Sequence, residues 1–296
     1  MTNKPPKVSV VIPCHNYAHF LPETLESVLN QTIPAFEVLV VDDSSSDNTP
    51  EIIASYGKRI SSIRVEGRGA YGARNDSLPH LSGDYFLNVD ADNRIAPDFI
   101  EQTLNALTKA PPDIGYIYTQ RQYFGDRQGL SSLENFSEEN ILIHKMVDMG
   151  ALIRMPLVKK YGFDERFNDG CGDQAFFIKL YEQGFRGQLL DAALLYYRVH
   201  GNSITGAVRK EYKQCRIQQR LIESFPTLFS EELAKQAMDD ARNRTLVSII
   251  HNRSADANFS RRLQDFKAFT RTNVRHAEWL RQLKYLVYPK AVLQKD

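Results

Sequence analysis

The sequence predicts an α/β fold in which a mainly parallel, twisted sheet is flanked by helices and followed by an α-helical C-terminal extension. Two observations support this prediction. Short apolar stretches typical of buried strands alternate with segments of helical periodicity over about the first 110 residues. From residue 208 onward, long helical patterns dominate. We therefore expect an α/β domain over residues 1–207 and a helical extension over residues 208–296.

Four strands are expected in the first hundred residues. They are KVSVVIP (7–13), FEVLVVDD (36–43), ISSIRV (60–65) and DYFLNV (84–89). Helices are expected near Pro22, from Ser46 or Asp47 to about Tyr56, after the glycines at 67, 69 and 72, and after Pro97. This alternation places the helices on both faces of the sheet and gathers the carboxyl ends of the strands at one edge, where such sheets bind ligands.

The middle of the chain has a mixed pattern. Strands are expected over residues 113–124, 147–155 and 189–203, with a helix inside residues 162–185. The polar segment 125–140 has no strong pattern of its own and is a candidate lid or specificity segment.

Composition narrows the class of protein. The three cysteines are far apart and fit no metal or redox spacing, and no apolar run approaches a membrane span or a signal peptide. We therefore expect a cytoplasmic protein, with peripheral contact on the inner face of the membrane as the alternative. Residues 1–207 hold 19 basic and 26 acidic side chains, so nucleic acid is not an expected partner.

Acidic residues follow two of the expected strands. Asp42 and Asp43 end one strand, and Asp90, Asp92 and Asn93 follow another. Acids gathered at one edge of a sheet repel one another, so a divalent cation or a hydrogen-bonding ligand would compensate them, and a hard cation with oxygen ligands would in turn bind a diphosphate. A single D-x-D sequence is weak support, because Asp92 and Asn93 could equally cap the helix after Pro97.

The complete set of motifs is more specific. In order and approximate spacing, it resembles the inverting nucleotide-sugar glycosyltransferases of family 2, which have the GT-A fold, over about residues 7–205. The motifs are VVIPCHN, VLVVDDSSSDNT, GARN, VDADN, GFDERF with GDQAFFIKL, and YYRVHGNSIT. The resemblance implies non-processive transfer of one sugar from a nucleoside-diphosphate sugar, a UDP-sugar foremost, to a saccharide or lipid-linked acceptor in bacterial cell-surface polysaccharide or glycoconjugate assembly.

The same resemblance assigns roles to individual residues. Asp173 is the candidate general base, and Asp92 and His200 are the candidate ligands of Mn²⁺ or Mg²⁺. The candidate nucleotide-sugar-binding residues are Pro13, His15, Asn16, Asp42, Asp43, Arg74, Asp90, Ala91 and Ser203.

The chain departs from the family pattern at three positions. Gly67 stands where relatives commonly have Asn, and Asn93 stands where they have a fourth Asp. Gly172 replaces the first acid of an E-D pair, and we expect it to leave room for the acceptor beside Asp173.

The turn after the first strand argues against two other classes of enzyme. IPCHNYAHF lacks the glycine-rich loop of a sugar-phosphate nucleotidyltransferase and the G-x-G-x-x-G of a dinucleotide-dependent dehydrogenase. A processive polymerase is disfavoured because Q-x-x-R-W is absent. A non-catalytic sugar-nucleotide binding module stays open because of Gly172.

The C-terminal extension carries a basic, amphipathic stripe. Trp279, Leu283, Leu286 and Val287 have helical spacing, and residues 258–296 hold nine basic and three acidic side chains. The pattern favours packing on the catalytic domain or on a second copy in a homo-oligomer, with docking on a membrane surface as the alternative.

Overall fold

The computed structural model describes residues 5–144, 147–201 and 213–251. The chain divides into two compact units, Met1–His200 and Gly201–Asp296. The predicted domain boundary at residue 207, the predicted site residue Ser203 and the C-terminal stripe lie outside the described residues.

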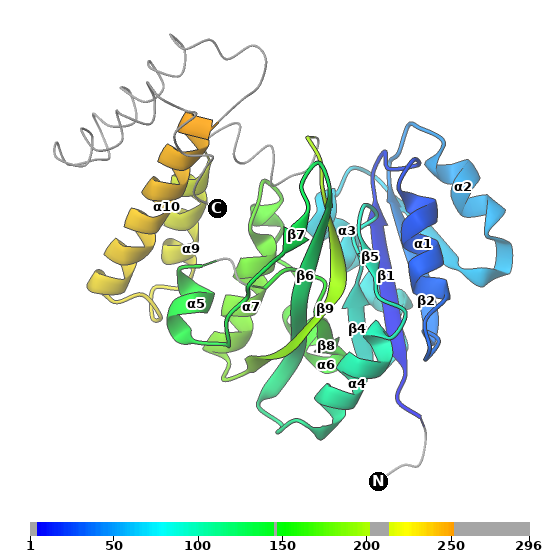
Figure 1. Cartoon of the computed structure of the whole chain (residues 1–296), viewed down its shortest axis with the longest axis horizontal. Helices are drawn as coiled ribbons and strands as arrows, with labels where there is room; N and C mark the ends of the chain where they lie inside the picture. The colour runs from blue at the N-terminus through cyan, green and yellow to red at the C-terminus, as the bar shows by residue number, and fades with distance from the viewer. Residues whose placement is uncertain (1–4, 145–146, 202–212, 252–296) are drawn as a thin grey trace. The chain divides into compact units, whose positions relative to one another are not determined.

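Among the described residues, nine strands form one sheet in the first unit (Figure 1). Its order is β3-β2-β1-β4-β8-β6-β9-β5, with β7 paired to β6. The bounds are β1 Val8–Cys14, β2 Glu37–Asp43, β3 Ser61–Val65, β4 Tyr85–Asn88, β5 Arg94–Ile95, β6 Ile114–Gly125, β7 Gly129–Leu130, β8 Leu152–Arg154 and β9 Arg186–Val199.

The sheet is parallel where the sequence pattern is regular and mixed elsewhere. β1, β2, β3 and β4 run parallel, as the alternation of strands and helices predicted. β8 runs antiparallel to both β4 and β6, and it has three residues where the sequence predicted nine. This short reversed strand connects the parallel half to the β6–β9 pair.

Helices cover both faces of the sheet (Figure 1). In the first unit they are α1 Leu21–Leu29, α2 Thr49–Ser55, α3 Gly69–Ser77, α4 Phe99–Lys109, α5 Glu138–Leu142, α6 Met155–Tyr161 and α7 Gly172–Glu182. Short 3₁₀ turns occupy Gly57–Arg59, Leu78–His80 and Glu165–Phe167. The second unit contains α9 Gln214–Ser224 and α10 Glu231–His251, which pack against each other.

The core follows from the two-residue period of the strands. Alternate residues of β1, such as Val10 and Ile12, share one apolar cluster with Leu25 of α1 and Ile100 of α4. The opposite face is lined by aromatic rings, and the Tyr116 ring of β6 lies 4.4 Å from that of Phe177 of α7. This aromatic layer contacts both α3 and α7, since the Phe163 ring lies 6.5 Å from that of Tyr71 and 4.7 Å from that of Phe176.

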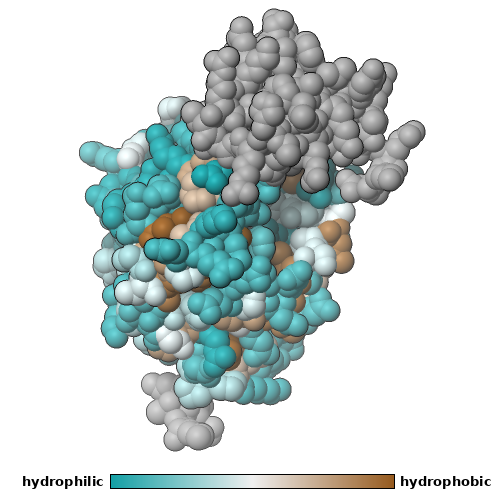
Figure 2. Space-filling model, turned by 90° about the vertical axis from the view of Figure 1, so that its left-hand side faces the viewer, coloured by the Kyte–Doolittle hydropathy of each residue, from teal (hydrophilic) through white to brown (hydrophobic). Residues whose placement is uncertain are grey.

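The surface gives no sign of a membrane span. No helix among the described residues is long and apolar enough to cross a bilayer. On the face drawn in Figure 2, hydrophilic residues cover most of the described part, and hydrophobic ones form small separate groups. Ile33, Phe36 and Leu130 are the large hydrophobic side chains exposed in the described part of the chain.

Candidate active site

The carboxyl ends of β1, β2 and β4 meet at one edge of the sheet. Cys14 pairs with Asp42 across β1 and β2, and Val11 pairs with Asn88 across β1 and β4. This register brings the loop after β1, the acids after β2 and the acids after β4 together, as the sequence predicted.

Asp42 and Asp43 are buried and already bound by this chain. Asp42 accepts a hydrogen bond from the Ser45 N–H at 2.9 Å and one from Arg64 Nη1 at 2.5 Å. Asp43 accepts from the backbone N–H groups of Arg68 at 2.7 Å and Gly69 at 2.8 Å, at the start of α3. The two carboxylates therefore hold the loops after β2 and β3 in place. A nucleobase that binds them would use carboxylate oxygens that already accept hydrogen bonds from these loops.

The loop after β1 rests on the loop after β2. His15 Nδ1 lies 2.5 Å from the Asp43 carbonyl oxygen, and the Asn16 N–H donates to Ser45 Oγ at 2.9 Å. Asn16 has a left-handed backbone (φ 57°), which Asn tolerates better than most residues. The Asn16 side-chain oxygen accepts from the Ser46 N–H at 2.7 Å. Pro13, also predicted to bind the nucleotide sugar, lies on β1 opposite Val41.

Arg74 of α3 holds the Asp90 side chain in a fixed orientation. The guanidinium is 4% exposed, and its Nη2 donates to Asp90 Oδ1 at 2.6 Å while its Nε donates to Asn88 Oδ1 at 2.8 Å. Asn88 Nδ2 also donates to Asp90 Oδ1, at 2.8 Å. Sequence reasoning missed Asn88, although an amide that interrupts an apolar strand was a usable signal. Ala91 is 1% exposed in the core, and its carbonyl oxygen accepts from Thr24 Oγ1 at 2.8 Å, so this predicted residue has little surface for a ligand.

Asp92 and His200 form a close pair at the same edge. His200 Nε2 lies 2.9 Å from Asp92 Oδ2, and each side chain is 13% exposed. Burial raises the pKa of the Asp92 carboxyl, and the hydrogen bond from His200 opposes part of that effect. The Tyr17 and Phe20 rings lie 5.7 Å and 5.2 Å from the imidazole, so the pair is walled by aromatic side chains.

Arg198 of β9 anchors the loop that carries Asp92. Its Nε donates to the Asp92 carbonyl oxygen and its backbone N–H donates to Asn93 Oδ1, both at 2.9 Å. Its guanidinium pairs with Glu23 of α1 and stacks on the Phe20 ring at 4.4 Å. Sequence reasoning did not single out Arg198, and its place two residues before His200 was the available signal.

These donors fit a divalent cation only in part. Among the described residues, no group of three or more His, Cys, Asp or Glu side chains is arranged to hold a metal. Asp92 and His200 offer carboxylate oxygen and imidazole nitrogen, which suit Mn²⁺. Diphosphate oxygens or water would have to supply the remaining ligands.

Asp173 lies in the first turn of α7, as predicted. It is 5% exposed, and its N–H donates to the Tyr71 hydroxyl at 2.9 Å. Its Oδ1 accepts from the Gln174 N–H at 2.9 Å. Cys171, just before the helix, has a left-handed backbone (φ 60°) that turns the chain into α7.

The expectation that Gly172 leaves room for the acceptor is wrong. A Cβ added to Gly172 would meet Cε2 of Tyr71 at 2.4 Å, closer than real Cβ contacts come. The Tyr71 ring therefore occupies the space where relatives carry the first acid of their pair. Tyr71 also lies under the Arg74 guanidinium, 4.9 Å from ring centroid to Cζ, and so links Asp173 to the Arg74–Asp90 pair.

The polar segment 125–140 is fastened to β6. Gln120 accepts from the Leu133 N–H at 2.7 Å and donates to the Leu133 carbonyl at 3.0 Å, and the Tyr118 hydroxyl donates to the Glu134 carbonyl at 2.9 Å. These bonds give no support to a lid at this segment.

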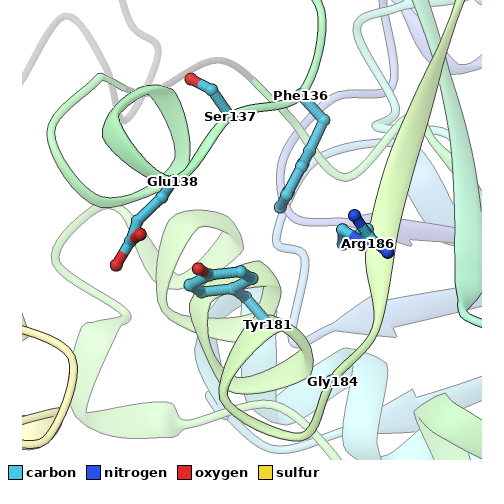
Figure 3. Close-up of a pocket in the computed structure, with 6 residues that line it drawn as sticks. All are labelled: Phe136, Ser137, Glu138, Tyr181, Gly184 and Arg186. Carbon is cyan, nitrogen blue, oxygen red and sulfur yellow. The ribbon is translucent and has the colours of Figure 1, made fainter.

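A cavity of about 390 Å³ lies beside the same segment (Figure 3). It is lined by Phe136, Ser137, Glu138, Tyr181, Gly184 and Arg186. Tyr181 is in the last turn of α7 and Arg186 begins β9, whereas Asp173 and His200 lie at the other ends of these two elements. The cavity is therefore separate from the candidate active site.

Comparison with known proteins identifies the family. Residues 9–170, more than half of the chain, match the sequence model of glycosyl transferase family 2. The chain belongs to this family. It is a glycosyltransferase, and its sheet and helices have the GT-A arrangement expected for the family.

Among curated relatives, the family 2 chain is 29% identical over 231 residues to the putative teichuronic acid biosynthesis glycosyltransferase TuaG of Bacillus subtilis. The match covers 75% of this chain and 91% of TuaG. An uncharacterized glycosyltransferase of Rickettsia typhi is 30% identical over 54% of each chain.

Solved structures of similar fold contain sugar nucleotides. TarS 1–349 of S. aureus in complex with UDP-GlcNAc aligns with a TM-score of 0.65 and 21% identity, over 90% of this chain and 81% of TarS. The mannosyltransferase PcManGT of Pyrobaculum calidifontis, in complex with GDP-Man and Mn²⁺, aligns with a TM-score of 0.61 and 18% identity, over 99% and 89%. At these identities the similarity establishes the fold alone.

Proposed function

We propose that this family 2 member is a metal-dependent, inverting glycosyltransferase. It moves one sugar from a nucleoside-diphosphate sugar, a UDP-sugar foremost, to a saccharide or lipid-linked acceptor in cell-surface polysaccharide or glycoconjugate assembly. The observation that carries the proposal is the linked set at one sheet edge: the Asp92–His200 pair, the Arg74–Asp90 pair, and Asp173 joined to the latter through Tyr71.

The comparisons support the donor and pathway classes. TuaG is described as a putative teichuronic acid biosynthesis enzyme, TarS was crystallised with UDP-GlcNAc, and PcManGT was crystallised with GDP-Man and Mn²⁺. The two crystal structures support a nucleoside-diphosphate sugar as donor, and the description of TuaG supports the pathway class.

The nucleotide is assigned to the loops after β1 and β2. Asp42 or Asp43 contacts the base edge, while Pro13, His15 and Asn16 line the base and ribose. Asp90, held by Arg74, contacts the ribose or the metal, and Ala91 anchors the loop that carries Asp90 and Asp92 through its carbonyl bond with Thr24. Ser203 completes the diphosphate site. Because the base-binding carboxylates are held by backbone N–H groups, the nucleotide meets a preformed surface.

Asp92 and His200 would hold the metal. A bound divalent cation supplies Lewis-acid stabilisation of the charge that develops on a leaving diphosphate. Imidazole nitrogen is a better ligand for Mn²⁺ than for Mg²⁺, so His200 favours Mn²⁺. Arg198 holds the Asp92 backbone while the carboxylate faces the ligand.

Asp173 supplies the base. The acceptor hydroxyl oxygen forms a bond to the anomeric carbon as the bond from that carbon to the phosphate oxygen breaks. The hydroxyl proton passes to an Asp173 carboxylate oxygen. Attack from the side opposite the leaving group inverts the anomeric centre, and no protein nucleophile takes part.

The alternative is a sugar-nucleotide binding module without catalysis, which Gly172 favours because the first acid of the pair is missing. The Tyr71 ring in its place gives Asp173 a fixed position and argues for catalysis.

Two measurements separate these alternatives. A thermal-shift screen of UDP-, GDP- and dTDP-sugars with and without Mn²⁺ should give one base whose sugar nucleotide raises Tm in an Mn²⁺-dependent way, since a ligand stabilises the state that it binds. Slow release of nucleoside diphosphate from that donor then indicates an enzyme. Binding without hydrolysis or transfer indicates a module, and the absence of any Mn²⁺-dependent shift overturns both.

A further inference from the structure

A second charged pair, formed by Arg121 and Asp148, is buried next to β6 and β8. Arg121 Nε of β6 lies 2.7 Å from Asp148 Oδ2, and the two side chains are 12% and 16% exposed. Asp148 Oδ1 accepts from the Gly150 N–H at 2.9 Å. Burying an ion pair costs several kcal/mol of desolvation, so such a pair is a poor way to gain stability and a common feature of functional sites.

The strand register explains where this pair lies. Ile117 of β6 is opposite Leu152 of β8, and the antiparallel register carried four residues further places Arg121 opposite Asp148, just before β8 begins. On the other side of β8, Leu87 is opposite the same Leu152. Three residues further, that register places Asp90 opposite the neighbour of Asp148.

Asp148 is within electrostatic reach of the two acids that the proposed reaction uses. The charges of Asp173 and Asp90 add to the effect of burial, which raises the pKa of the Asp148 carboxyl, while Arg121 acts in the opposite direction. Asp90 belongs to the diphosphate end of the proposed site and Asp173 is the proposed base, so Asp148 is subject to charges at both ends of the interval that separates them.

The sugar ring has to lie in this interval. In an inverting displacement the acceptor oxygen and the leaving oxygen are on opposite sides of the anomeric carbon, so the ring lies between the group that binds the diphosphate and the base. Asp148 has hydrogen-bonding capacity left for it. A carboxylate has about four acceptor positions: Asp148 Oδ1 accepts from the Gly150 N–H, whereas the buried Oδ2 lies 2.7 Å from Arg121 Nε without the geometry of a hydrogen bond.

We propose that Asp148 accepts hydrogen bonds from hydroxyl groups of the donor sugar and thereby selects the sugar, and that Arg121 is the positioning residue that keeps this carboxylate oriented. This inference rests on the proposed function. A hydrogen bond to a charged group contributes enough for about a ten- to hundredfold difference in affinity.

The test compares binding of nucleotide and sugar nucleotide. Calorimetry with Mn²⁺ measures Kd for UDP and UDP-GlcNAc, and for GDP and GDP-mannose, on the unmodified protein; the base that binds is carried forward. Asp148→Asn keeps the size of the side chain and an oxygen for the Gly150 N–H but removes the charge. It should weaken the sugar nucleotide about ten- to hundredfold and leave the diphosphate within about twofold.

A matched control lies at the other end of β6, where Asp113 precedes this strand and Arg186 begins β9. Arg186 Nη2 and Asp113 Oδ2 form an equally close pair, 2.7 Å apart, but their side chains are 58% and 41% exposed. Asp113→Asn should change neither affinity. Arg121→Lys keeps the charge but loses the planar fork, and it should give a smaller loss in the same direction as Asp148→Asn.

Each outcome decides the inference. An equal change in both ligands, or no change in either, would mean that the pair is a structural lock between β6 and β8. Loss of diphosphate binding and of its melting transition would show that Asp148→Asn does not fold. In that case Arg121→Lys decides, by the ratio of its Kd for the sugar nucleotide to its Kd for the nucleoside diphosphate. Failure of the unmodified protein to bind UDP, GDP or dTDP overturns the proposed function itself, before any variant is made.

Discussion

The nucleotide end and the sugar end of the site use buried acids in different ways. At the nucleotide end, Asp42 and Asp43 are bound by three backbone N–H groups and one arginine, and they organise the loops that surround them. At the metal and sugar end, Asp92 lies beside His200, Asp148 lies beside Arg121 and accepts from the Gly150 N–H, and burial raises the pKa of both carboxyls. Asp42 and Asp43, which are fully hydrogen-bonded, stabilise the loops around them. Asp92 and Asp148 are buried with fewer partners, which lowers stability and is typical of residues that bind a ligand or a metal.

The largest effect is expected at Asp173. Asp173→Asn keeps the size of the side chain and an oxygen for the Gln174 N–H but removes the base, so the transfer rate should fall about 10²- to 10⁴-fold. Donor Kd and Tm should stay near those of the unmodified protein. Single-turnover transfer measures the rate. Transfer at the parent rate would move the base to Asp169 or Glu165, and unfolding would make Asp173 a structural helix cap.

The next largest effect is expected at the metal pair. Asp92→Ala should abolish the Mn²⁺ dependence of UDP binding, and His200→Ala should weaken it, since a ligand set with two protein donors cannot lose one without a large drop in affinity. Titration of Mn²⁺ at fixed UDP, followed by calorimetry, measures this. The control is Asp42→Asn, which should weaken UDP binding at every Mn²⁺ concentration alike. Full Mn²⁺ dependence in Asp92→Ala would remove Asp92 from the metal site.

The sequence predicted the nucleotide end better than the sugar end, for a physical reason. β1, β2 and β4 are short apolar runs followed directly by their functional residues, so local pattern places Asp42 and Asp90 at strand tips. The pairing of Arg121 with Asp148 depends on the register of a three-residue antiparallel strand. Tyr71 and Gly172 are a hundred residues apart in the chain, and a single sequence gives no sign that one fills the space left by the other.

A moderate effect is expected where Tyr71 meets Gly172. Gly172→Ala should destabilise the fold by about 1–3 kcal/mol, because its Cβ would overlap the Tyr71 ring in a packed site. In a Tyr71→Ala background the ring is absent, and the same change should cost nothing or stabilise slightly, since Ala favours a helix over Gly. Urea unfolding of the four proteins in this double-mutant cycle gives the coupling free energy. Additive effects would show that the ring and the glycine are independent.

The smallest effect concerns Cys14, at the nucleotide end. Burial raises the pKa of its thiol to about 11, with a hydrogen bond to Thr49 opposing part of that shift. At pH 8 a thiol with this pKa has about 100-fold less thiolate than one with an ordinary pKa near 9, so it should react slowly with a disulfide reagent. The raised pKa means that the stabilising contribution of the neutral thiol is complete below pH 9 and is lost as the pH rises through about 11.

The measurement uses the double variant Cys171→Ser, Cys215→Ser, in which Cys14 is the remaining cysteine of the 296-residue chain. Labelling of the folded protein at pH 8 should be about 100-fold slower than labelling in urea, and UDP should change it little because Cys14 packs beneath the loops rather than in the site. Labelling as fast as in urea would mean that the loops around β1 and β2 open readily. The nucleotide end would then be no more rigid than the sugar end. The hydrogen bonds of Asp42 and Asp43 would not stabilise their loops in the way that the comparison with Asp92 and Asp148 requires.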